Sequence, residues 1–197
     1  MNPDIQVVET KILSDNWYIL KKVSFLQKGK KGVWTRQTRE VYDRGNGATI
    51  LLYHLENKTL ILTRQFRMPT YMNGNTHGEL IETCAGLLDG EDPQDAIKRE
   101  TEEETGYVIS KPHKIFELYM SPGSVTELVY FYMATYEQKD RLSEGGGVEG
   151  EEIEVLEMGF QDAFEMVSDG RIKDGKTVIL LQYLRQLLTE GGNHNFP

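Results

Sequence analysis

Short apolar runs separated by turn residues dominate the first part of the chain. Within residues 5–43, the segments NWYILKKVSFLQ and VWTRQTREVYD are joined by the turn KGKKG. After the break DRGNG come ATILLYHLE and LILTRQFRMPT, which are separated by a turn at residues 56–59. Runs of this length between turn signals are typical of antiparallel strands. We therefore predict a β-meander over residues 5–43, followed by a second hairpin.

A helix is predicted to follow directly after Asp92. Asp92 is a good N-cap residue, and Pro93 suits the first helical position. Gly106 suits the left-handed residue that ends a helix. Counted at helical spacing, Glu100 and Glu104 fall on the stripe that should face the core.

The glutamates of this helix are its most unusual feature. Glu100 and Glu104 stand one turn apart near the C-terminal end, where like charges and the helix dipole both disfavour them. Glu103 borders the same face, and Arg99 can pair with one carboxylate. Either this is a solvated acidic surface or a cation binds among the side chains. Oxygen ligands without clustered His or Cys indicate Mg²⁺, with Mn²⁺ as a substitute.

The rest of the chain adds strands around this helix and two helices at the end. The segments ELIETCAG, HKIFELYM, VTELVYFYMATYE and IEVLEMGF read as strands, and QKDRLSEGGGVEGEE as an irregular stretch. Helices are predicted near residues 161–169 and 176–189. Strands interrupted by few helices predict an α+β fold. We expect a small antiparallel β subdomain at residues 1–44 and the main domain at 45–197.

Composition restricts the partners. The 197 residues are 39% hydrophobic and 27% charged, with a formal charge of −9, which argues against nucleic acid but not against a small anionic substrate. The single cysteine, Cys84, suits a reducing compartment and reads as a core residue. Neither a signal peptide nor a membrane span is visible, so we expect a cytoplasmic protein without a membrane partner.

The segment from Gly86 to Tyr107 resembles the Nudix box. Its pattern is Gly, five residues, Glu, seven residues, then Arg-Glu-aliphatic-x-Glu-Glu-x-Gly-aliphatic. The matching positions are Glu91, Arg99, Glu100, Glu103, Glu104 and Gly106. The first spacing is one residue short, and Thr101 and Tyr107 replace aliphatic residues. The resemblance implies an α/β/α sandwich of mixed sheets that hydrolyses a diphosphate with the help of Mg²⁺.

Further segments narrow the resemblance to one branch. Pro122 lies fifteen residues beyond the box, a marker of the enzymes that cleave nucleoside diphosphate sugars. KILSDN, REVYDRGNGATILLY, LIETCAGLLD, FELYMSPG and DGKTV are similar to the bacterial GDP-mannose pyrophosphatases. This implies cleavage of GDP-mannose to GMP and mannose 1-phosphate. ADP-ribose is the alternative substrate, and a non-catalytic nucleotide-sugar sensor is the alternative from another class.

The same resemblance implies the residues of the site. Metal ligands would be the main-chain carbonyl of Ala85 and the carboxylates of Glu100, Glu104 and Glu151. Substrate contacts would come from Trp17, Thr38, Arg39, Glu40, Arg67, Ala85, Gly86, Leu87, Glu104, Glu127, Gly150, Glu151 and Lys176. The resemblance also implies a homodimer in which the N-terminal strands of one subunit reach the site of the other.

Several roles stay open at this stage. The general base could be Glu149, Glu152 or, from the box itself, Glu103. Trp17 stands where tyrosine is expected and keeps a flat ring for stacking, whereas Thr38 replaces an expected basic residue. The loop GGGVEGEE reads either as a flexible solvated loop or as a segment that closes over the site.

Lys176 opens a predicted helix, where a cation opposes the helix dipole. It is either an exposed lysine that costs little or part of an anion site.

Overall fold

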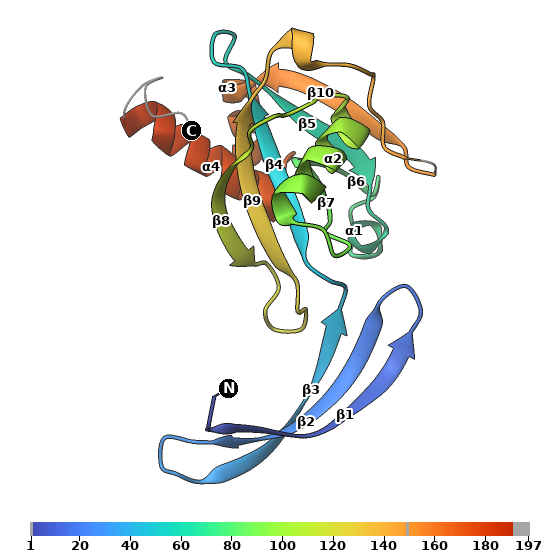
Figure 1. Ribbon diagram of the computed structural model, residues 1–197, viewed down its shortest axis with the longest axis vertical. Helices are drawn as coiled ribbons and strands as arrows, with labels where there is room; N and C mark the ends of the chain where they lie inside the picture. The colour runs from blue at the N-terminus through green and yellow to red at the C-terminus, as the bar shows by residue number, and fades with distance from the viewer. Residues whose placement is uncertain (1, 149, 191–197) are drawn as a thin grey trace. The chain divides into compact units, whose positions relative to one another are not determined.

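The computed structural model describes residues 2–148 and 150–190. The chain divides into two compact units (Figure 1). The first consists of residues 1–46 together with 119–128, and the second of residues 47–118 together with 129–197. The first unit therefore ends two residues beyond the expected position 44, and it includes a loop that returns from far along the sequence.

The first unit is a three-stranded antiparallel sheet. Its strands are β1 (Ile5–Asp15), β2 (Ile19–Lys28) and β3 (Trp34–Asp43), in that order. The predicted β-meander is confirmed. The backbone N–H of Tyr42 donates to the carbonyl of Ser124 at 2.7 Å, and the N–H of Thr126 donates to the carbonyl of Tyr42 at 3.0 Å. These two bonds attach the returning loop to the end of β3.

Little of this first sheet is buried. Among the described residues of its three strands only Ser24 is fully buried. Apolar side chains of β1 are exposed, among them Val7, Val8, Ile12 and Leu13. The register pairs Val7 with Phe25 and Ile12 with Lys21 of β2, and it shifts at Val8 and Leu13. Since Phe25 and Lys21 lie an even number of residues apart, Val7 and Ile12 share one face of the sheet, and both are exposed.

The second unit is built on a seven-stranded mixed sheet. Its main path runs β10 (Ile153–Gly159), β5 (Thr59–Phe66), β4 (Gly47–Tyr53), β9 (Leu128–Thr135) and β8 (His113–Tyr119). Strands β4 and β9 are parallel, whereas β5 is antiparallel to both β4 and β10. All seven residues of β4 are buried, as expected for a central strand with both faces covered.

The segment ELIETCAG forms two strands where the sequence predicts one. Strand β6 (Glu79–Glu82) pairs with the end of β5, and β7 (Cys84–Leu87) pairs with the start of β4. The ladder between β4 and β5 covers only Leu52–Tyr53 with Leu60–Ile61. The two strands therefore diverge, and β6 and β7 fill the gap on either side of Thr83. The short helix α1 (Met68–Met72) was not predicted.

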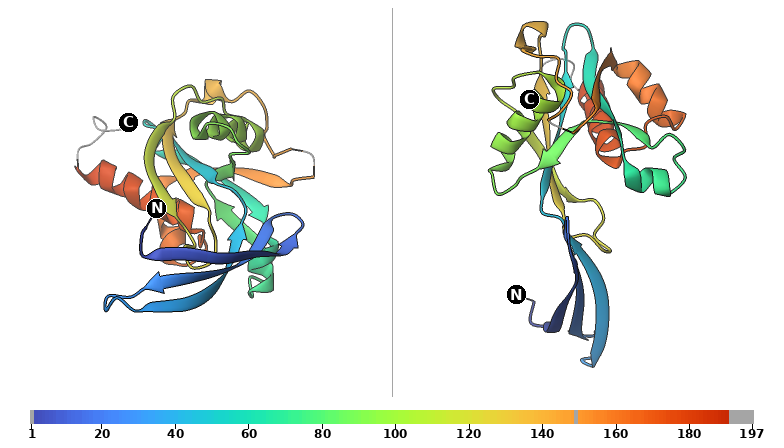
Figure 2. Two further views of the ribbon diagram at one scale, coloured as in Figure 1. Left: turned by 60° about the horizontal axis from the view of Figure 1, so that its bottom comes forward. Right: turned by 90° about the vertical axis from the view of Figure 1, so that its right-hand side faces the viewer.

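Helices cover both faces of this sheet (Figure 2). Helix α2 (Pro93–Thr105) lies on one face, while α3 (Phe160–Ser168) and α4 (Gly175–Glu190) lie on the other. Ile50 and Leu52 of β4 join Ile97 of α2 in one core cluster. The α/β/α sandwich implied by the sequence is confirmed. None of the helices within residues 2–148 and 150–190 is long and apolar enough to cross a lipid bilayer.

The sequence signals at the ends of α2 act as predicted. The Asp92 side chain accepts a hydrogen bond from the N–H of Gln94 at 2.9 Å, and Gly106 has φ 78°. Ile97 and Thr101 are buried on the core side, together with Glu104. The stripe inferred from the spacing therefore faces the sheet, with two glutamates in it.

Candidate active site

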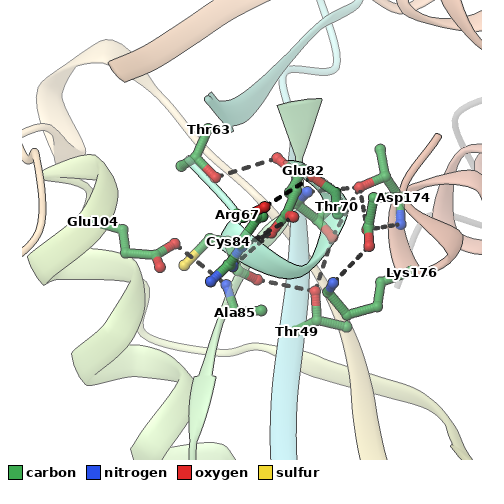
Figure 3. Close-up of polar contacts among 12 residues, drawn as sticks. Thr49, Thr63, Arg67, Thr70, Glu82, Cys84, Ala85, Glu104, Asp174 and Lys176 are labelled. Atoms are coloured by element: carbon green, nitrogen blue, oxygen red, sulfur yellow. Dashed lines mark hydrogen bonds and ion pairs between the residues drawn. The ribbon is translucent and has the colours of Figure 1, made fainter. Parts of the chain in front are cut away.

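Glu104 is the most buried carboxylate of the glutamate helix, with 5% of its surface exposed. Its Oε2 atom accepts a hydrogen bond from the N–H of Ala85 at 3.3 Å, and it contacts the thiol of Cys84 (Figure 3). The pKa of Glu104 is raised to about 7, mainly by burial and also by the nearby charge of Glu100. The hydrogen bonds of Cys84 and Ala85 and the charge of Arg67 oppose this shift without cancelling it.

Glu100 packs against strand β7. A side chain at Gly86 would collide with the Glu100 carboxylate, so a glycine is needed there for the helix to approach the strand. Burial raises the pKa of Glu100 against the opposing effect of Arg99, and the charges of Glu103 and Glu151 add to the increase. Two carboxylates whose charged forms are disfavoured thus lie on the same helix face.

Arg99 forms ion pairs with three acidic side chains of the box. Its Nη1 atom lies 2.9 Å from Glu100 Oε1 and 3.0 Å from Glu103 Oε2, and its Nε atom lies 3.4 Å from Glu91 Oε2. One guanidinium therefore orients three carboxylates, as predicted for a supporting residue.

Arg67 lies beside these carboxylates and pairs with Glu82. The Arg67 Nη2 atom is 2.6 Å from Glu82 Oε2, and Nε is 3.1 Å from Oε1. Burial disfavours the charged guanidinium, but the carboxylates of Glu82, Glu104 and Asp174 together raise its pKa. In Figure 3 Arg67 and Glu82 lie between Glu104 on one side and Asp174 on the other.

Lys176 lies at the start of α4 and pairs with Asp174. Its Nζ atom is 2.7 Å from Asp174 Oδ1. Asp174 Oδ2 accepts from both the N–H and the hydroxyl of Thr177, at 2.9 and 2.8 Å, and so caps the helix. The side chain of Lys176 is only 20% exposed, so the alternative of an exposed, unengaged lysine does not describe it.

The glycine-rich loop is attached to the C-terminal end of α2. The N–H groups of Gly146 and Gly147 donate to the carbonyls of Glu104 and Glu103, at 2.9 and 3.0 Å. A side chain at Gly145 would collide with the Glu104 carbonyl. The loop thereby satisfies carbonyls that the end of a helix leaves without partners. This contact was not foreseen from the sequence, which left the loop either solvated or closing over the site.

The acidic residues of the same loop lie just beyond this attachment. Glu151 Oε2 accepts from the N–H of Val148 at 3.1 Å, and its charge contributes to the raised pKa of Glu100. Glu152 is exposed and makes no hydrogen bond or ion pair within the part of the chain that the structure describes. Gly150 is exposed with φ 92°. Glu149, a candidate base, lies outside the described residues.

Ala85, Gly86 and Leu87 form strand β7 beside α2. Ala85 directs its N–H to Glu104. Because the N–H and C=O of one strand residue point to the same side, the carbonyl of Ala85 also faces α2. This orientation suits the main-chain metal ligand that the resemblance implies.

The remaining candidate substrate residues belong to the first unit. Trp17, in the turn after β1, is 86% exposed. On β3, Arg39 donates to the Thr38 carbonyl at 2.8 Å, and Thr38 Oγ1 lies 3.2 Å from Ser24 Oγ. Glu40 is exposed on the same strand. Glu127 lies in the returning loop, with Oε1 3.5 Å from Arg44 Nε.

The chemistry of the donors in the second unit fits a hard cation. Among the described residues no three acidic, histidine or cysteine side chains form a ready metal cluster. Glu100 and Glu104 nevertheless carry charge that burial disfavours, and Ala85 adds a carbonyl facing the same helix. A divalent cation between these oxygens would offset that electrostatic cost.

Four polar residues that pair with the candidate site residues or with one another were not predicted from the sequence. Glu82 pairs with Arg67, and Asp174 pairs with Lys176. The other two are Thr83 and Thr177, which are joined by a hydrogen bond. A weak signal was available, because Glu82 and Thr83 interrupt an otherwise apolar strand segment and are buried. Buried polar groups need partners, but the sequence alone does not identify them.

Comparisons with known proteins extend over the whole chain. A model of the GDP-mannose pyrophosphatase NudK N-terminal domain matches residues 4–42, and a NUDIX domain model matches residues 43–181. A protein named GDP-mannose pyrophosphatase from Pectobacterium atrosepticum is 56% identical over 93% of this chain and 95% of its own length. One with the same name from Salmonella typhimurium is 56% identical over 94% of this chain and 97% of its own length.

A solved structure is similar in fold. It is described as an ADP compounds hydrolase, with a TM-score of 0.71 and 18% identity, and covers 94% of each chain. At that identity the likeness supports the fold alone.

Proposed function

The chain belongs to the Nudix hydrolases and carries the N-terminal domain of their GDP-mannose pyrophosphatases, and from this membership we propose that it cleaves GDP-mannose to GMP and mannose 1-phosphate. The observation that carries the proposal is identity of 55–56% along nearly the whole chain to proteins of that name. The two glutamates that face the sheet from α2 are consistent with a hydrolase.

The cofactor we propose is Mg²⁺, with Mn²⁺ as a substitute. Glu100, Glu104, Glu151 and the carbonyl of Ala85 would hold it. When bound, such a cation neutralises phosphate charge and activates water. Arg99 keeps the Glu100 carboxylate in place through the 2.9 Å contact, so the ligand geometry is partly fixed in advance.

Arg67 and Lys176 are the residues of the second unit that would bind the phosphates. Arg67 uses Nε and Nη2 for Glu82, which leaves Nη1 for a ligand. Lys176 gives one N–H to Asp174 and keeps two. Gly86 and Leu87, with Gly150 and Glu151 of the loop, would complete the pocket around the diphosphate.

The first unit would supply the contacts to base and sugar. Trp17 presents an exposed ring for stacking, and Thr38, Arg39, Glu40 and Glu127 offer polar groups.

For the general base, Glu152 is favoured over Glu103, because Glu103 is engaged by Arg99. Glu149 is the third candidate. Replacing each by glutamine and measuring the pH dependence of kcat identifies the base, since its loss removes the acidic limb of the profile.

A panel of nucleotide sugars tests the substrate. The protein with Mg²⁺ is incubated with GDP-mannose, ADP-ribose, ADP-glucose or UDP-glucose, and the released phosphate monoesters are measured. GDP-mannose should give the highest kcat/KM. Turnover of ADP-ribose that equals or exceeds it would contradict the assignment. Binding of GDP-mannose without cleavage of any compound would instead support the sensor.

We also propose a homodimer with exchanged N-terminal strands. The exposed apolar residues Val7 and Ile12 on one face of β1 support it, because contiguous exposed apolar surface marks sites of protein–protein contact. Light scattering should give twice the mass of one chain. Ile12→Lys should lower that mass, while Lys11→Arg, a control on the same strand, should not. A monomeric wild-type protein would rule the dimer out.

The proposed compartment is the cytoplasm. The lone cysteine, Cys84, is buried and unpaired to another cysteine, which fits a reducing environment. Fractionation of cells that express the native chain tests this placement.

A further inference from the structure

Arg67, beside the glutamate helix, and Lys176, at the start of α4, are each held by a carboxylate that is itself little exposed. Arg67 forms a two-point contact with Glu82, which is 2% exposed. Lys176 contacts Asp174, whose side chain is 11% exposed. In both pairs the cation is the more exposed member, with side-chain exposures of 38% and 20%. Each cation is therefore anchored by a less exposed carboxylate, and it keeps N–H groups that this carboxylate does not use.

The pair of Arg67 and Glu82 is fixed by its backbone setting. Glu82 ends β6, and its carbonyl accepts from the hydroxyl of Thr63 at 3.3 Å. Arg67 stands at the N-cap of α1, and its carbonyl accepts from the hydroxyl of Thr70 at 2.9 Å. With both backbones held, the two-point contact leaves the guanidinium plane little freedom.

The pair of Lys176 and Asp174 is fixed through a chain of buried hydroxyls. Thr177 receives a hydrogen bond from the backbone N–H of Thr83 at 2.7 Å. Thr83 Oγ1 lies 2.8 Å from Thr49 Oγ1, which donates to the carbonyl of Cys84 at 2.9 Å. The start of α4 is thereby tied to β4 and to β7, the strand that contains Ala85. Lys176 and Ala85 are consequently held by one polar network.

Stability alone does not explain why Glu82 and Asp174, two carboxylates of low exposure, lie at these positions. A buried ion pair often contributes no more to stability than apolar residues of similar size. A flexible lysine on a helix N-terminus is also disfavoured by the dipole. The arrangement is useful for a ligand, because a group that is already oriented loses less conformational entropy on binding.

We propose that Glu82 and Asp174 are positioning residues, which orient Arg67 and Lys176 toward the diphosphate of the substrate. The inference rests on the proposed function, since it assigns these two cations to the phosphates. Glu82 fixes the plane of the Arg67 fork so that Nη1 faces the ligand. Asp174 fixes the Lys176 ammonium, which has no preferred direction of its own.

Conservative variants test this role. Glu82→Gln and Asp174→Asn keep the shape of the side chain, and asparagine also keeps the helix cap. Each should lower kcat/KM for GDP-mannose by about 10–100-fold, the usual range for residues that orient a functional group. Thermal unfolding, followed in parallel, shows that the variant is folded.

Matched controls remove other ion pairs of similar geometry. Glu154→Gln breaks the 2.7 Å contact of Glu154 on β10 with Arg64 on β5, the strand next to β6. Asp169→Asn breaks the 2.6 Å contact of Asp169 with Arg171, shortly before Asp174 in the chain. Both pairs are exposed, and both controls should retain kcat/KM within about twofold.

Double-mutant cycles separate positioning from a purely structural role. If Glu82 acts through Arg67, then Glu82→Gln should have less than a twofold effect in an Arg67→Gln background. The same should hold for Asp174→Asn in a Lys176→Gln background. Effects that multiply in both cycles would overturn the inference. If the Arg67 variants do not fold, the cycle on Lys176 decides.

The outcome is distinguishable from a failure of the proposed function. Wild-type turnover of GDP-mannose with unaffected Glu82→Gln and Asp174→Asn variants refutes only the positioning role. If the wild type cleaves no nucleotide sugar, calorimetric titration with Mg²⁺ and inorganic pyrophosphate replaces the kinetic readout. Equal affinity of wild type and both variants for pyrophosphate would then overturn the inference.

Discussion

The two units of this chain both contain strands with apolar residues, but they differ in how far these strands are buried. In the sheet of the first unit, only Ser24 among the described strand residues is buried, and apolar side chains of β1 such as Val7 and Ile12 are exposed. In the second unit, β4 is buried along its whole length beneath helices on both faces. Apolar content alone therefore does not make a core, because a sheet also needs layers to cover it.

The difference extends to polar chemistry. In the second unit carboxylates are buried, and burial shifts their pKa values upward. In the first unit the candidate residues Trp17, Arg39 and Glu40 are exposed. This difference agrees with the proposal that the second unit holds the cation and that the first presents groups to the substrate.

The largest effect should follow from removing the carboxylates of α2. Glu100→Gln and Glu104→Gln should each lower kcat by more than about 100-fold while leaving the fold intact, because they remove ligands of the proposed cation. Circular dichroism and steady-state kinetics check both points. Glu102→Gln on the exposed side of the same helix serves as the control, and wild-type rates in either variant would contradict the metal assignment.

Truncation of one aliphatic side chain in each unit measures the difference in burial. Leu51→Ala in β4 should lower the free energy of unfolding by about 2–5 kcal/mol, because Leu51 is fully buried. Val7→Ala in β1, which is 64% exposed, should change it by less than about 0.5 kcal/mol in the isolated chain. Urea titrations give both values. A large loss for Val7→Ala would show that β1 is covered, as a dimer would require.

The pH dependence of stability should reveal Glu104. Its pKa is about 7 in the folded metal-free protein and 4.5 as the reference value. The folded state thus binds this proton more tightly, so the contribution of Glu104 to stability is largest below pH 4.5 and is lost as the pH rises through about 7. The loss due to this group is about 3 kcal/mol. Urea titrations with EDTA should show the decline in wild type and a smaller one in Glu104→Gln; identical slopes would contradict the shift.

The smallest effect concerns two glycines, one in a loop of each unit. Gly145 has φ 69°, and a side chain there would meet the end of α2. Gly145→Ala should therefore cost about 1–3 kcal/mol of stability and lower kcat, because the loop that carries Glu151 would shift. Gly123→Ala, in the returning loop of the first unit, has open space around it and should be nearly neutral. Thermal unfolding compares the two, and equal losses would remove the distinction.

Local signals in the sequence were sufficient for much of this fold. The ends of α2 were predicted from Asp92, Pro93 and Gly106, since capping depends on only a few adjacent residues. The direction of Glu100 and Glu104 toward the sheet followed from helical spacing. The division of ELIETCAG into two strands could not be predicted, because it depends on how far apart β4 and β5 lie.

The candidate site shows the same limit. The sequence indicated Arg67 only through resemblance and Lys176 also through its position at a helix start, and the predicted site included neither Glu82 nor Asp174. Arg67 and Glu82 are 15 positions apart, whereas Lys176 and Asp174 are only two positions apart. The hydroxyl chain that ties the start of α4 to β4 and β7 spans 94 positions between Thr83 and Thr177. No local rule specifies partners as distant as Arg67 and Glu82 or Thr83 and Thr177.

The sequence by itself determined the family, the sandwich fold and the acidic helix face, because these depend on motifs and on the periodicity of side chains. Only the tertiary structure decided which groups are buried and which partners they have. It attached the glycine loop to the last turn of α2, raised the pKa of Glu104, and paired Arg67 with the buried Glu82 and Lys176 with the less exposed Asp174. The physical reason is that desolvation and charge pairing depend on distances between segments, which the order of residues does not contain.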